Sequence, residues 1–109
     1  MDKSHRINFL KSELLENPDD EFTQYALGLE FLEIDLEKSI YYFENLLAKS
    51  PNYLSAYYQL GRAYFKSHSE IQAIDIIKKG IELALTQKDL HSLAELRNML
   101  VPRCGAIRR

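Results

Sequence analysis

Histidine and acidic side chains are the first residues to consider for chemistry in this chain of 109 residues. The three histidines, His5, His68 and His91, are far apart in the sequence. His91 and Glu95 are separated by one helical turn and are therefore spaced to share a metal ion, but two ligands do not make a site by themselves. A histidine exposed to solvent near the end of the chain is the favoured interpretation.

The single cysteine and the acidic cluster do not supply a reaction centre either. Cys104 alone forms no internal disulfide and no thiolate metal site. Asp19, Asp20 and Glu21 suit the start of a helix, where the macrodipole favours acidic groups, and they lack the spacing of a calcium loop. The motifs HExxH, GxxxxGK[ST], GxSxG and GxGxxG are absent from the sequence. We therefore predict a protein that is not an enzyme and binds no metal or cofactor.

The composition is that of a globular domain, with 46% hydrophobic and 28% charged residues. A net charge of −2 disfavours a dedicated nucleic-acid-binding protein. No apolar run approaches the roughly 20 residues of a membrane span, and the first residues lack the apolar core of a signal peptide. We expect no nucleic acid and no membrane among the partners, and a cytoplasmic location.

Helical periodicity of apolar residues dominates the chain, and short polar segments interrupt it at regular intervals. Asp35 and Asp89 are placed to cap the helices that follow them, as are Asp19 or Asp20 and Ser67 or Ser69. Pro102 is expected to end the last helix. The pattern predicts six antiparallel helices, over about residues 4–16, 21–32, 36–49, 53–66, 70–85 and 89–100.

An internal repeat is the second signal in the sequence. The pair Leu27-Gly28 recurs as Leu60-Gly61, and Pro18 recurs as Pro51, both after 33 residues. A period between about 20 and 50 residues is typical of a solenoid, in which each unit buries its apolar face on its neighbours.

These residues resemble the tetratricopeptide repeat (TPR) family, whose helix-turn-helix unit of about 34 residues follows W-x2-L-G-x2-Y…A-x3-F…P. The matching residues of the later unit are Tyr57, Leu60, Gly61, Tyr64, Ala73 and Ile77. Those of the earlier unit are Gln24, Leu27, Gly28, Phe31, Ser39, Phe43 and Pro51. The earlier unit departs from the pattern at Gln24, where an aromatic residue is usual, and at Ser39.

The resemblance implies an all-α fold, in which antiparallel helix-turn-helix repeats stack as a short right-handed α-solenoid of about six helices. A single domain is expected over residues 1–100, with repeat units at about 21–53 and 54–87. Helices at about 4–16 and 89–100 flank them, the latter as a polar cap. Residues 101–109 are set apart as a tail, because LVPR at 100–103 resembles part of an engineered protease site.

Gly61 lies in the interior of a predicted helix, where glycine costs about 1 kcal/mol relative to alanine. Tyr57, Leu60 and Tyr64 share its helix face. The expected reason for the glycine is close approach of a neighbouring helix, flanked by the tyrosine rings. Gly28 is expected to repeat this arrangement.

The other face of each first helix is the candidate binding surface, because in TPR proteins these faces line a concave groove that holds an extended peptide or a helix. Rigid aromatic rings give contact area at low entropic cost, and Arg62 with Lys66 could meet a carboxylate. The candidate residues are Phe22, Tyr25, Leu29, Glu33, Ser55, Tyr58, Arg62, Phe65 and Lys66.

Core packing is the competing interpretation of this surface. Leu29, Leu32 and Phe65 are expected to be at least partly buried, because apolar helical stripes usually face the core. Tyr25, Tyr58 and Arg62 are expected to face the groove. The sequence thus predicts a non-catalytic module that binds a protein or peptide partner. A self-associating piece, either a homodimer or a fragment of a longer array, is the main alternative, and an enzyme resting on His91 with Glu95 is the third.

Overall fold

Six α-helices and no strand form residues 2–104, the part of the chain that the computed structural model describes. The prediction of an all-α protein is therefore confirmed. Each helix lies within two residues of its predicted start. The helices are α1 (Lys3–Glu16), α2 (Glu21–Phe31), α3 (Leu36–Lys49), α4 (Leu54–Lys66), α5 (Glu70–Gln87) and α6 (Leu90–Cys104).

Aspartate side chains begin three of the helices, because a carboxylate can accept a hydrogen bond from an otherwise unpaired N–H of the first turn. The predicted caps Asp35 and Asp89 are confirmed: their Oδ1 atoms accept from the backbone N–H of Lys38 at 3.3 Å and of Ser92 at 3.0 Å. Asp2 caps α1 in the same manner, accepting from the N–H of His5 at 2.8 Å.

Two predicted caps occupy the right position without making the expected bond. Asp20 precedes α2, but its carboxylate accepts a hydrogen bond from the hydroxyl of Thr23 and none from a backbone N–H. Ser69 precedes α5 and makes no side-chain cap. Its hydroxyl instead lies 3.2 Å from that of Ser67.

The last two helices run beyond their predicted ends, α5 by two residues and α6 by four. α5 continues past Leu85 to Gln87 and stops at Lys88, which adopts the left-handed conformation (φ 59°, ψ 35°). The N–H of Asp89 then donates to the carbonyl of Ala84 at 2.9 Å and that of Lys88 to Leu85 at 3.2 Å, which is the Schellman pattern of helix termination.

Pro102 does not end α6, which extends to Cys104. Proline lacks its own N–H donor, but its fixed φ is helical. The backbone stays helical for two more residues despite the hydrogen bond that proline cannot donate.

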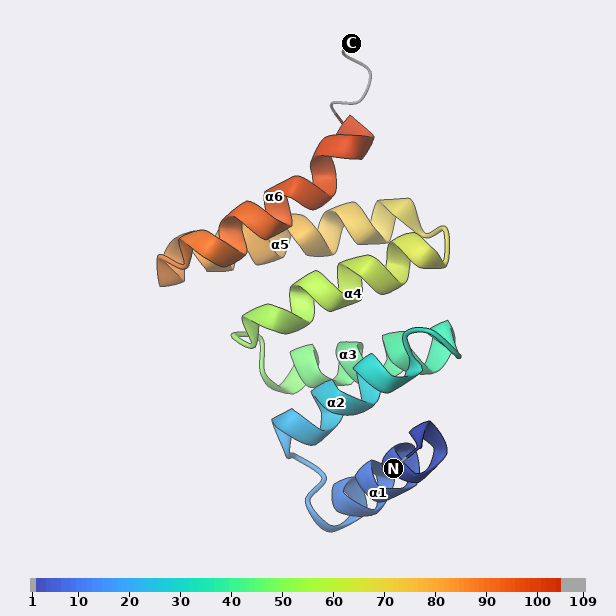
Figure 1. Ribbon diagram of the computed structural model, residues 1–109. Helices are drawn as coiled ribbons and strands as arrows, with labels where there is room; N and C mark the ends of the chain where they lie inside the picture. The colour runs from blue at the N-terminus through green and yellow to red at the C-terminus, as the bar shows by residue number, and fades with distance from the viewer. Residues whose placement is uncertain (1, 105–109) are drawn as a thin grey trace. The chain divides into compact units, whose positions relative to one another are not determined.

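The contacts divide the chain into two compact units, Met1–Pro51 and Asn52–Arg109. This boundary lies within two residues of the predicted junction between the repeat units. Each unit contains a helical hairpin, α2 with α3 in the first and α4 with α5 in the second (Figure 1). α1 packs on α2, and α6 packs on α5. The expectation of a single domain over residues 1–100 stays a prediction.

In the first hairpin, α2 and α3 approach closely where Gly28 contacts the ring of Phe43. A Cβ atom added at Gly28 would lie 2.6 Å from Cζ of Phe43, whose ring is completely buried. The buried hydroxyl of Ser39 donates to the carbonyl of Gly28 at 2.7 Å. Ser39 thus binds the adjacent helix at the place where the motif has alanine, and this bond satisfies a buried polar group.

The second hairpin uses two glycines in the same way. A Cβ at Gly61 would lie 2.6 Å from Cγ1 of Ile77, so the predicted close approach of the partner helix is present. Gly80 of α5 was missed by the sequence analysis, although a Cβ there would lie 2.8 Å from Cβ of Tyr57. Each helix of the hairpin therefore provides a gap for a side chain of the other.

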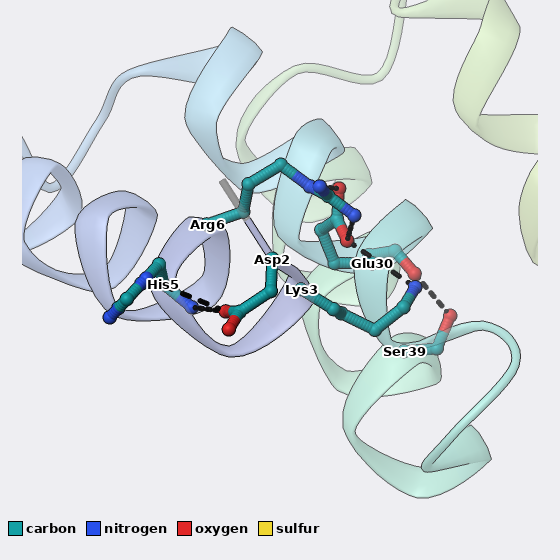
Figure 2. Close-up of polar contacts among 7 residues, drawn as sticks. Asp2, Lys3, His5, Arg6, Glu30 and Ser39 are labelled. Carbon is teal, nitrogen blue, oxygen red and sulfur yellow. Dashed lines mark hydrogen bonds and ion pairs between the residues drawn. The ribbon is translucent and has the colours of Figure 1, made fainter.

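An ion cluster fastens α1 to α2 in the first unit (Figure 2). Nε of Arg6 lies 3.0 Å from Oε2 of Glu30, and Nζ of Lys3 lies 3.4 Å from Oε1. The side chain of Glu30 is only 20% exposed. The hydrogen bond from Arg6, which outweighs the effect of partial burial, lowers the pKa of Glu30, and the charges of Arg6 and Lys3 act in the same direction.

This lowered pKa predicts an acid-sensitive contribution to folding. The pKa of Glu30 is lower in the folded than in the unfolded chain, so its stabilisation is complete above the ordinary value of 4.5 and is lost as the pH falls through the folded value. Urea unfolding at pH 6.5 should show Glu30→Gln to be less stable than the natural protein. At pH 3 this difference should shrink.

The exposed Glu13 of α1 offers a matched control, because Glu13→Gln also removes one carboxylate. It should leave the free energy of unfolding nearly unchanged at both pH values. An equal deficit of Glu30→Gln at pH 6.5 and pH 3 would show that ionisation of Glu30 does not stabilise the fold.

Candidate binding faces on the first helices

The α2 face of the first unit exposes apolar side chains on a helix whose other side is buried. Leu27 and Gly28 are buried, whereas the ring of Phe22 is 69% exposed and Leu29 is 37% exposed. Leu29 is thus exposed, and the expectation that it is partly core was wrong. Tyr25 is half-buried, and its ring meets that of Phe43 at 5.8 Å between centroids. The core therefore fixes the orientation of Tyr25.

The candidate residue Glu33 lies beyond the end of α2 and therefore not on its helical face. α2 ends at Phe31, because the N–H of Leu32 donates to Leu29 at 3.2 Å and the N–H of Asp35 donates to Phe31 at 2.8 Å. Glu33 lies in the turn that follows and is exposed. Leu32 is 4% exposed and belongs to the core, as expected.

The α4 face of the second unit is more closely tied to the core. Tyr58 and Phe65 are half-buried and pack against a cluster that contains Ile77 and Leu96. Phe65 is partly core, as expected, whereas Tyr58 is not a fully exposed groove residue. Ser55 and Lys66 are exposed at opposite ends of the face.

Arg62 is the polar centre of the α4 face. It is half-buried, and its Nη1 donates to Oε1 of Gln59 at 3.0 Å. This bond orients the guanidinium, which presents several donors in one plane and matches a carboxylate well. Lys66 lies one helical turn further on, so the two cations favour an acidic group on this side of α4.

His91 and Glu95, the residues with the spacing of metal ligands, lie close together without a third ligand among the described residues. Nε2 of His91 lies 3.4 Å from Oε2 of Glu95, and both side chains are largely exposed. Within residues 2–104, no three histidine, cysteine, aspartate or glutamate side chains gather closely enough to hold a metal ion. In the same part of the chain, no helix combines the length and apolar character that crossing a membrane requires.

The arrangement of the helices is shared with proteins of known structure. Two solved structures, one from crystals and one from NMR in solution, match the chain, each described as a tetratricopeptide repeat domain protein from Salinibacter ruber. Both are 33% identical to it, with TM-scores of 0.73 and 0.75. The matches cover 80% and 84% of this chain and 99% and 94% of the other.

These two matches confirm the predicted all-α helical repeat fold. No protein-family model matches the chain. The curated proteins contain no match either.

Proposed function

This chain belongs to the tetratricopeptide repeat family, and we propose that it is a non-catalytic module that binds a peptide or a helical segment of another protein along its first helices. Membership of the family supports a protein-interaction module in general. The proposal adds the location of the binding surface: the exposed side of α2 in the first unit and the exposed side of α4 in the second.

The exposed ring of Phe22 is the observation that carries this proposal. An aromatic side chain that is 69% exposed on a helix with a buried opposite side is available to a partner without unfolding. Leu29 extends the apolar surface two turns along α2. Partner side chains that cover such groups remove apolar area from water, which drives association.

The α4 face supports a partner that also carries a carboxylate. Arg62 and Lys66 supply positive charge, and the half-buried Tyr58 supplies a rigid aromatic surface beside them. A segment with one acidic side chain and apolar neighbours fits this combination. Charge complementarity of this kind mainly raises the rate and the specificity of association.

Affinity capture from the native lysate tests the proposal with substitutions that spare the core. The variant Phe22→Ser, Leu29→Ser, Arg62→Gln changes only the first-helix faces. It should capture less than about a tenth of each partner that the natural protein retains, because a tenfold loss needs about 1.4 kcal/mol and truncating one interface hot spot costs about 2 kcal/mol or more. Quantitative mass spectrometry of the eluates measures the ratio.

A matched control changes exposed apolar residues of the other helix type. Ile71 and Leu85 of α5 are 84% and 52% exposed, so Ile71→Ser, Leu85→Ser removes similar surface elsewhere. It should retain all partners. Equal capture by the natural protein and the first-helix variant, with both folded by circular dichroism, would refute the proposed faces.

Self-association is the alternative function, and it would bury the same exposed side chains. The mass of the protein in solution distinguishes it from binding to another protein. Light scattering after size exclusion should give about the monomer mass of 12.7 kDa at all protein concentrations if α2 and α4 serve another protein. A dimer that Phe22→Ser dissociates would assign these faces to a second copy of the chain.

A further inference from the structure

A pocket of about 370 Å³ lies in the first unit, away from the α2 binding face. The end of α1 contributes Leu14, the following turn contributes Pro18, and α3 contributes Tyr41, Tyr42 and Asn45. It shares no residue with the proposed first-helix faces, and the inference drawn from it does not depend on them.

Gln24 of α2 also lines this pocket and carries an unpaired acceptor. The residue is 5% exposed, and its Nε2 donates to the carbonyl of Pro18 at 2.9 Å. That bond fixes the orientation of the amide, because rotating the amide would set two oxygens against each other. Oε1 is buried and has no hydrogen-bond partner within the described structure. A buried acceptor in this state favours any ligand that brings a donor.

The other side chains of the pocket define what kind of donor fits. Tyr41 is 59% exposed and lies edge-on to Tyr42, with 5.3 Å between ring centroids and an interplanar angle of 78°. These rings, with Leu14, favour an aromatic ligand. Lys49 also lines the pocket and pairs with Asp19 at 2.8 Å. Its ammonium disfavours a cationic donor, so a neutral donor fits this pocket better than a cationic one.

The repeat register shows what this position normally holds. Gln24 takes the motif position of Tyr57, whose aromatic side chain is buried within the second unit. The first unit therefore has an amide in place of an aromatic ring at this position, and a pocket beside it. An indole is neutral and aromatic, and its N–H is a donor only, so it complements an acceptor better than a hydroxyl does.

We propose that this pocket binds the indole of a tryptophan side chain presented by a partner protein, with the indole N–H donating to Oε1 of Gln24. A second copy of the chain cannot supply the group, because the sequence contains no tryptophan. A neighbouring pocket of about 300 Å³ shares Leu14 and Tyr42 and adds Leu15, which is 83% exposed. It receives an apolar side chain adjacent to the tryptophan.

Access to Oε1 requires a small rearrangement, since the atom is buried from solvent. Asn45 and Tyr42 are half-buried and line the pocket beside Gln24, so the proposal requires one of these side chains to rotate. Binding therefore perturbs the side-chain amides of both Gln24 and Asn45.

Nuclear magnetic resonance titration with N-acetyltryptophanamide tests the proposal on the whole protein. The side-chain amide signals of Gln24 and Asn45 should shift saturably, whereas those of Gln59 on α4 should not. The analogue methylated at the indole nitrogen lacks the donor and should bind at least about tenfold more weakly, because it cannot form the hydrogen bond to Oε1. The absence of a saturable shift up to the solubility limit, or equal binding of the two compounds, would overturn the proposal.

A variant of Gln24 distinguishes the contribution of the hydrogen bond to Oε1 from that of the shape of the pocket. Gln24→Met keeps the length of the side chain and removes the acceptor, so it should bind both compounds equally and weakly. Continued preference for the unmethylated compound in this variant would also overturn the proposal. Where Gln24→Met fails to fold, the two compounds decide the question on the natural protein alone.

Discussion

Gly28→Leu is expected to destabilise the protein by about 1–3 kcal/mol or more through overpacking. Even the first carbon of the new side chain would lie 2.6 Å from the buried ring of Phe43. The ring is fully enclosed, so it cannot move aside without shifting its helix. Leucine gains about 1 kcal/mol of helix propensity over glycine, and the steric effect must exceed this gain. Urea unfolding followed by circular dichroism measures the net change.

A double-mutant cycle identifies the cause of this effect. Gly28→Ala should also destabilise, and Phe43→Leu should reduce that penalty because a smaller side chain leaves room for the added methyl group. Purely additive changes would show that the contact between residues 28 and 43 is not what excludes a side chain at position 28.

Phe43→Ala is expected to have the largest effect of any single change, at about 3–5 kcal/mol. The side chain is completely buried, and the glycine beside it offers no atoms that could fill the resulting cavity. A loss of this size is a large part of the roughly 5–15 kcal/mol that stabilises a typical domain. Thermal and urea unfolding should therefore show a protein near its folding limit at 37 °C.

The loss should also reach the binding face, because the ring of Tyr25 packs on Phe43. Tyr41 of the same helix is the control: it is 59% exposed, and Tyr41→Ala should change stability by less than about 1 kcal/mol. Similar losses for the two variants would mean that burial at Phe43 does not govern folding of the first hairpin.

The helices could be predicted because their signals are local. The 3.6-residue period and the caps Asp35 and Asp89 depend on residues within one or two turns. The end of α5 could not be predicted, because it is set by a left-handed lysine at position 88, and lysine gives no signal for that conformation. The close approach at Gly61 was predicted from the motif, but Gly80 has no place in that motif and was overlooked.

The candidate site was only partly accessible to sequence reasoning. Helical spacing placed Phe22 and Leu29 on one side of α2, but not the contact of Tyr25 with Phe43, which lies across the hairpin. The pocket at Gln24 depends on the positions of α1 and α3, which are separated by a whole helix. In the sequence its sole trace is a glutamine in place of an aromatic residue.

The fit of Tyr57 against Gly80 limits how such repeats can be recombined. Counted from the buried Ile77 and Phe43, Leu46 stands in α3 where Gly80 stands in α5. A chimera that pairs α4 with α3 would place Leu46 against Tyr57, at a position where α5 has a glycine and no room for a side chain. The unit that can be recombined is therefore the complete hairpin. Recombination during evolution or in design should join segments between hairpins and never within one.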